Sequence, residues 1–82
     1  MGQMEDWARL REIAERTFPV GTRLEMLYSS DPYAPISPGE RGTVDFIDAA
    51  GTLHMKWDSG RTLGVIIGQD QFRVIQDETA ED

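Results

Sequence analysis

The sequence has few side chains that could act as a nucleophile, a base or a metal ligand, because it contains one histidine and no cysteine. His54 lies between Leu53 and Met55, and its imidazole could act as a general base or contact a ligand. The same alternation is typical of a histidine on the exposed face of a strand, and we favour this interpretation. Without cysteine a zinc site is not expected, and no spacing supports a Ser-His-Asp triad.

Asp58, in residues 56–61 (KWDSGR), is the other candidate for catalysis. Its carboxylate could take part in a reaction, but capping the turn that Gly60 completes is the simpler role. Residues 39–42 (GERG) lack the lysine and the following helix of a phosphate-binding loop, and the acidic residues lack calcium-loop spacing. We therefore expect no catalytic residue, no metal and no cofactor, and a protein that is not an enzyme.

A second group of side chains could bind a partner without catalysing a reaction. Prolines stiffen residues 29–40, and this loop carries Tyr33 and Ile36. The two residues either plug the end of a small β-domain, which we favour, or contact a partner. Trp57 is expected in the core, but beside Tyr33 at the surface it would suit an anionic or proline-rich ligand. The candidate binding residues are Tyr28, Tyr33, Ile36, Arg41, Trp57 and Arg61.

A helix and a series of short strands must position these residues. Helical spacing predicts a helix over residues 4–17, with Trp7, Leu10 and Ala14 on one stripe that must pack on the chain or on a partner. Alternation predicts strands over 22–28, 42–48, 52–58, 61–67 and 72–75. Val44 and Phe46 are expected to face inward, and Ile47 breaks the alternation, which indicates either a bulge or a twist toward a second buried surface. Residues 68–71 are expected to form a helical turn.

The order of these elements predicts a fold class. A strand, a long loop, a three-stranded meander, a helical turn and a last strand are the plan of a mainly β, SH3-like small barrel of five strands, preceded by an N-terminal α-helix. We expect a helix over 1–18, the barrel over 19–75 and a disordered acidic tail over 76–82. The tail carries −4 of the net charge of −7, so the body is close to neutral.

The composition also bears on location. No apolar run approaches the roughly 18 residues of a membrane span, and the first residues lack the pattern of a signal peptide. We expect a soluble, cytoplasmic protein with no membrane contact.

Four stretches together resemble a known family. They are residues 18–25 (FPVGTRLE), 31–44 (DPYAPISPGERGTV), 51–64 (GTLHMKWDSGRTLG) and 70–73 (DQFR). In order and spacing they are similar to the small bacterial and phage family known as domain of unknown function 4314. The resemblance covers roughly residues 18–75. It implies an SH3-like barrel found in bacteria, phage and mobile elements, and it implies no activity and no functional residues.

Two functions fit these observations. The first is a non-enzymatic module that binds a protein partner through the 29–40 loop and the helix, and on a phage or mobile element it could inhibit a host defence protein. The alternative is a small barrel that binds nucleic acid or a nucleotide through Arg41, Lys56 and Arg61 with stacking aromatics. A homo-oligomer is compatible with both.

Overall fold

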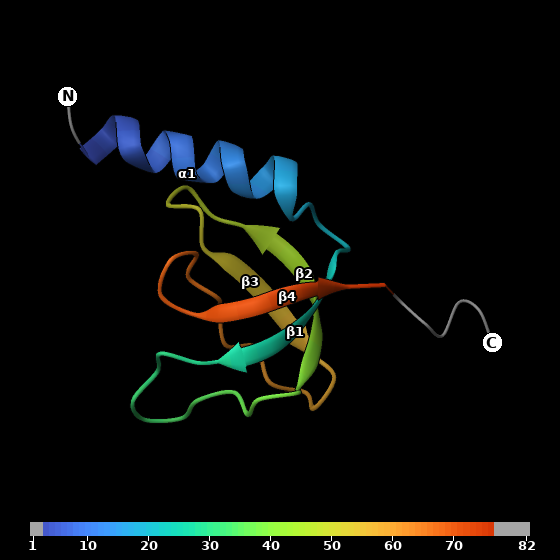
Figure 1. Cartoon of the computed structure of the whole chain (residues 1–82). Coiled ribbons are helices and arrows are strands. Elements are labelled where there is room, and N and C mark those ends of the chain that lie inside the picture. The colour runs from blue at the N-terminus through green and yellow to red at the C-terminus, as the bar shows by residue number, and fades with distance from the viewer. Residues whose placement is uncertain (1–2, 77–82) are drawn as a thin grey trace.

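The computed structural model describes residues 3–76 of the chain, and the side chains of residues 8–76. It consists of a helix and an antiparallel sheet (Figure 1). The elements are α1 (Gln3–Thr17), β1 (Arg23–Tyr28), β2 (Arg41–Ile47), β3 (Leu53–Trp57) and β4 (Gln71–Ile75). The mainly β fold and the helix are confirmed. The Trp7 side chain and residues 77–82 of the predicted tail lie outside the described part.

The sheet has four strands in the order β3-β2-β1-β4. Strand β1 is central and pairs antiparallel with both β2 and β4, so Glu25 lies opposite Arg41 on one side and Arg73 on the other. Strands β3 and β4 are the two edges, and the sheet does not close between them. The predicted closed barrel of five strands is therefore not confirmed.

The strand predicted over residues 61–67 is replaced, within the described chain, by isolated contacts with β3. Val65 exchanges two backbone hydrogen bonds with Leu53, at 2.8 and 2.9 Å, and Trp57 N–H donates to the Arg61 carbonyl at 2.9 Å. Between these contacts the Leu63 carbonyl accepts the indole N–H of Trp57 at 2.8 Å. A side chain therefore donates to a carbonyl that would accept a β3 amide in a regular ladder, and the predicted strand is absent.

The core lies on one face of the sheet and under the 29–40 loop. Its fully buried apolar residues come from every layer of the fold: Ala14, Leu24, Met26, Ile36, Val44, Leu53, Met55, Trp57 and Val65. Trp57 is 3% exposed, which confirms its predicted place in the core. Its ring lies where a side chain at Gly42 would be, since a Cβ there would come within 2.7 Å of Trp57 Cε3. This contact explains the glycine.

Strand β2 contains a bulge, which is one of the two alternatives that the break at Ile47 indicates. Its register with β3 shifts between Val44, which lies opposite Met55, and Phe46, which lies opposite His54. The extra residue turns Phe46 to the outer face, where it is 51% exposed and its ring stacks on His54 with centroids 4.3 Å apart. The prediction that Phe46 faces inward is therefore wrong, because a bulge reverses the alternation after it. Ile47 packs against the core instead.

The helix packs on the β2 side of the sheet and near its hairpin. Ala14 is fully buried, and Phe18 meets the ring of Phe72 edge-on with centroids 5.2 Å apart. Gly51 lies against the helix backbone, since a Cβ there would be 3.0 Å from the Leu10 carbonyl carbon. Within the described residues, no helix is both long and apolar enough to span a membrane.

The β2–β3 hairpin is closed by Asp48. Its Oδ1 accepts the Ala50 and Thr52 amides at 2.9 and 3.0 Å, and Oδ2 lies 2.8 Å from His54 Nε2. The hydrogen bond from His54 lowers the pKa of Asp48, burial opposes the shift, and the two amides add to it. His54 is therefore a half-exposed strand residue that is paired within the hairpin.

This pairing predicts a pH dependence of stability. A carboxyl whose pKa is lowered by folding stabilises the protein above its unfolded pKa, and this contribution is lost as the pH falls through the folded pKa. Asp48→Asn keeps an acceptor for the amides but removes the titration. We expect its free energy of unfolding, measured by urea denaturation, to fall less between about pH 5 and pH 2 than in the wild type. Ser59→Ala, which removes no titrating group, should keep the wild-type slope, and so would Asp48→Asn if this account were wrong.

Candidate functional site

Residues 29–40, the Tyr33 loop, leave the sheet after β1 and return at the start of β2, at the end of the sheet away from α1 (Figure 1). Asp70 anchors the beginning of this loop. Its Oδ1 accepts Ser30 N–H at 2.6 Å and Ser30 Oγ–H at 2.8 Å, while Oδ2 accepts Ile66 N–H at 2.7 Å. Asp70 is 8% exposed, so these bonds compensate for burying its carboxylate. One carboxylate therefore joins the Tyr33 loop to the turn before β4.

Two further side chains fix the tip of the loop. Asp31 Oδ1 accepts the Tyr33 amide at 2.8 Å and the Ala34 amide at 3.3 Å, which is an Asx turn. The Arg61 guanidinium donates to the Ala34 carbonyl at 2.5 Å and to the Pro35 carbonyl at 3.0 Å. Ile36 then enters the core, where it is fully buried. The loop is thus fixed by side-chain bonds as well as by its prolines.

The side chain that this arrangement displays is Tyr33. It is 92% exposed, the highest value among the large apolar side chains of the described chain that lie at the surface. The prediction that Ile36 plugs the domain is confirmed, and the same prediction for Tyr33 is wrong. Proline on either side of the Tyr33–Ala34 dipeptide and the bonds to Asp31 and Arg61 hold the backbone so that the ring points outward.

A groove lies beside the loop and has a volume of about 290 Å³. We call it the Asp70 groove. It is lined by Ser30, Asp31, Pro32, Leu63, Gly64, Ile66, Gln69 and Asp70. Ile66 is 42% exposed, so part of the groove wall is uncovered apolar surface. The groove and Tyr33 form the candidate binding site.

The predicted binding residues do not form one cluster. Trp57 and Ile36 are in the core, and the Arg61 guanidinium donates to two carbonyls of the Tyr33 loop. Arg41 lies on the outer face of the sheet, 3.7 Å from Glu25, which also accepts a bond from Arg73 at 2.7 Å. Tyr28, at the end of β1, is 57% exposed. Of the predicted set, Tyr33 and Arg61 therefore belong to the candidate site.

Asp58 has a different role from the one that the sequence predicts. Both of its oxygens accept bonds from the Arg23 guanidinium, each at 2.8 Å, and this bidentate pair lowers the pKa of the carboxyl. The prediction that the side chain caps its own turn is wrong. Arg23 and Asp58 are 35 positions apart, and nothing in their local sequence indicates the pairing.

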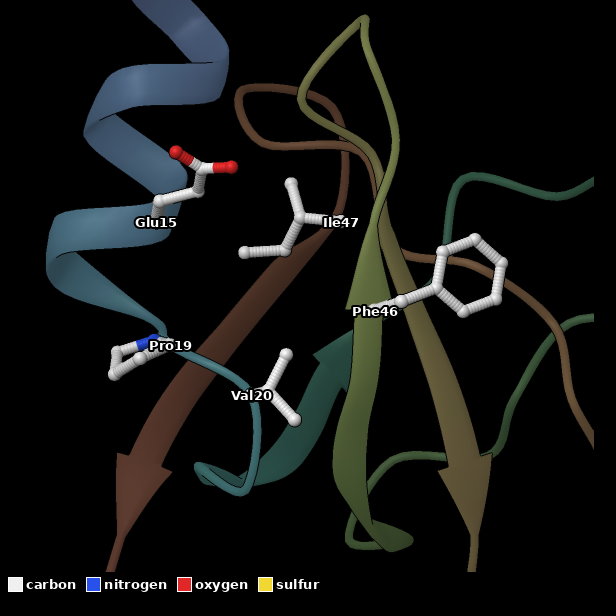
Figure 2. Close-up of a pocket in the computed structure, with 5 residues that line it drawn as sticks. All are labelled: Glu15, Pro19, Val20, Phe46 and Ile47. Carbon is white, nitrogen blue, oxygen red and sulfur yellow. The ribbon is translucent and has the colours of Figure 1, made fainter.

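A second groove lies between α1 and β2 and has a volume of about 390 Å³. Figure 2 shows the side chains that line it, which are Glu15, Pro19, Val20, Phe46 and Ile47. Ile47 extends toward the helix, while Phe46 points to the other side of β2 because of the bulge (Figure 2). The groove is mainly apolar, with one carboxylate at its helix side.

Among the described residues, no three histidine, aspartate or glutamate side chains gather where they could hold a metal ion.

Asp70 and Ser30 are the site residues that sequence reasoning missed. The Asp-Pro pair at residues 31–32 was a usable signal for the Asx turn, whereas nothing near Asp70 in the sequence indicates that it is buried.

Fold and site together define a small β-rich domain with a fixed, aromatic-tipped loop and an adjacent groove. The chain belongs to the family described as Domain of unknown function (DUF4314), whose model matches residues 6–75. The resemblance noted in the sequence is therefore confirmed. Among curated proteins, none matches this sequence.

The role of Asp70 can be tested by truncation. Asp70→Ala leaves the amides of Ser30 and Ile66 without their acceptor in a part-buried site. We expect the free energy of unfolding to fall by about 2–4 kcal/mol, as measured by urea denaturation. Gln69→Ala, an exposed neighbour on the same turn, should change it by less than about 0.5 kcal/mol. Equal stability of the two variants would show that Asp70 does not hold the loop.

Proposed function

We propose that the protein is a non-enzymatic binding module that engages a protein partner through Tyr33 and the Asp70 groove. The observation that carries the proposal is a tyrosine that is 92% exposed on a loop fixed by Asp31, Arg61 and Asp70. A large aromatic side chain on a fixed backbone loses little conformational entropy when it is buried in an interface. Tyrosine is also one of the residues that most often dominate binding energy.

The proposal includes an SH3-like plan for the domain. Two observations support this plan. The strand order is β3-β2-β1-β4, and residues 61–67 contact β3 in the place where a barrel would have its fourth strand. In this plan the Tyr33 loop is the long loop after the first strand. It commonly contributes to peptide grooves in such domains.

The alternative, a nucleic-acid or nucleotide binder, has less support because its basic residues have other contacts. Arg41 lies 3.7 Å from Glu25, Lys56 lies 4.0 Å from Asp45, and Arg61 binds loop carbonyls. Trp57, expected as a stacking platform, is buried. Of the net charge of −7, −4 lies in residues 76–82 and −3 in residues 1–75, so the body has no excess of basic residues to attract phosphates.

The same charge suits a partner with a basic surface. Proteins that act on nucleic acid have such surfaces, and carboxylates can occupy phosphate positions on them. The proposal extends to a phage or mobile-element inhibitor of a host defence protein that acts in the cytoplasm; the family resemblance implies such a source but no activity. Whether the module also associates with itself is a separate prediction, which sedimentation would test.

The proposal predicts that partner capture depends on Tyr33. The full chain would be immobilised and exposed to a bacterial host lysate, and bound proteins quantified by mass spectrometry. We expect Tyr33→Ala to lower recovery of the specific partner by at least about tenfold, the loss of one hot-spot residue, with no change in thermal stability. Phe46→Ala, an exposed aromatic at the α1–β2 groove, is the matched control and should retain the partner. Loss with Phe46→Ala and retention with Tyr33→Ala would refute the proposal.

A further inference from the structure

The size of the Asp70 groove limits what it can hold. Its volume of about 290 Å³ is at the lower limit of pockets that enclose a drug-sized ligand. A single long side chain from a partner is of suitable size. The groove lies next to Tyr33 in the chain, since Asp31 and Pro32 line it and precede the tyrosine directly.

The polar part of the groove is negatively charged. Asp31 and Asp70 line it, and no lysine, arginine or histidine does. Asp70 uses both oxygens for Ser30 and Ile66. The bonds that Asp31 accepts within residues 3–76 all go to its Oδ1, which leaves Oδ2 able to accept a donor from a ligand.

The remainder of the wall is apolar. Pro32, Leu63 and Ile66 line it, and Ile66 is 42% exposed. Lysine and arginine have both features that fit such a wall, because their methylene stems cover apolar surface while the cationic head reaches a carboxylate. A purely apolar side chain would leave the carboxylates without a partner, and an anion would be repelled.

The geometry points to a lysine or arginine side chain of the partner protein as the occupant of the Asp70 groove, with its stem on Pro32, Leu63 and Ile66 and its cationic head at Asp31. This inference rests on the proposed function and specifies the chemistry of the partner.

The inference can be tested without knowing the partner. Butylammonium and butylguanidinium ions reproduce the ends of lysine and arginine, and 1-butanol is a neutral control of similar length. Each would be titrated into the ¹⁵N-labelled full chain. We expect both cations to shift the amide signals of Gly64, Ile66 and Gln69 saturably, and 1-butanol to shift them much less. Equal shifts with 1-butanol, or no shift with either cation, would overturn the inference.

A charge-removing variant tests the role of Asp31. Asp31→Asn keeps an oxygen for the Tyr33 and Ala34 amides, because asparagine forms the same Asx turn. We expect cation affinity to fall about tenfold, as for the loss of one charge-assisted hydrogen bond. Asp45→Asn, on the exposed side of β2, should leave it unchanged. Undiminished affinity in Asp31→Asn, or an equal loss in both variants, would contradict the assignment.

A salt titration uses only the wild-type protein, so its result does not depend on whether a variant folds correctly. Cation binding should weaken as salt rises from about 0.05 M to about 0.5 M, since a half-exposed charge pair is screened. Binding that does not depend on salt would contradict the inference.

The titrations also separate this inference from the proposed function. If partner capture depends on Tyr33 but the groove does not bind cations selectively, the groove assignment alone is refuted. If the groove binds cations selectively but partner capture does not depend on Tyr33, the proposed Tyr33 interface alone is refuted.

Discussion

The structure depends on a buried carboxylate. Asp70 lies 40 positions from Ser30 in the sequence, yet it holds both the beginning of the Tyr33 loop and the amide of Ile66. A carboxylate that is 8% exposed would be costly without these donors. The donors, on Ser30 and Ile66, are joined through Asp70, and this connects the Tyr33 loop to the turn before β4. This contact fixes where the loop begins and one wall of the groove, while Asp31 and Arg61 fix the loop tip that exposes Tyr33.

The polar side chains of the sheet and those of the Tyr33 loop have different roles. The outer face of the sheet is covered by pairs that satisfy one another, such as Arg23 with Asp58 and Glu25 with Arg41 and Arg73. The hairpin between β2 and β3 is closed by Asp48 and His54. These polar groups are used within the molecule, whereas the Tyr33 loop and its groove combine the most exposed large apolar side chain of residues 8–76 with a carboxylate, Asp31, that accepts bonds there through Oδ1.

The sequence predicts the local elements well because their signals are local. Helix α1, the buried side chains of β1 and β3 and an irregularity in β2 each follow from neighbouring residues, although Leu10, expected on the packed stripe of the helix, is 37% exposed. The prediction for Phe46 is wrong because the bulge lies before this residue and reverses its face. The prediction of a strand over residues 61–67 is wrong because this segment makes isolated contacts with β3, with the Trp57 indole donating to the Leu63 carbonyl between them. The pairs Asp70–Ser30 and Arg23–Asp58 join distant positions, and a single sequence does not reveal such contacts.

The central claim is that the Tyr33 loop is held in one conformation before any partner binds. ¹⁵N relaxation of the free protein measures this most directly, through the order parameters of the Ser30, Tyr33 and Ala34 amides. The account predicts values of about 0.8 or higher, as in the strands, because carboxylate oxygens accept all three amides. Values below about 0.6, typical of a flexible loop, would contradict it.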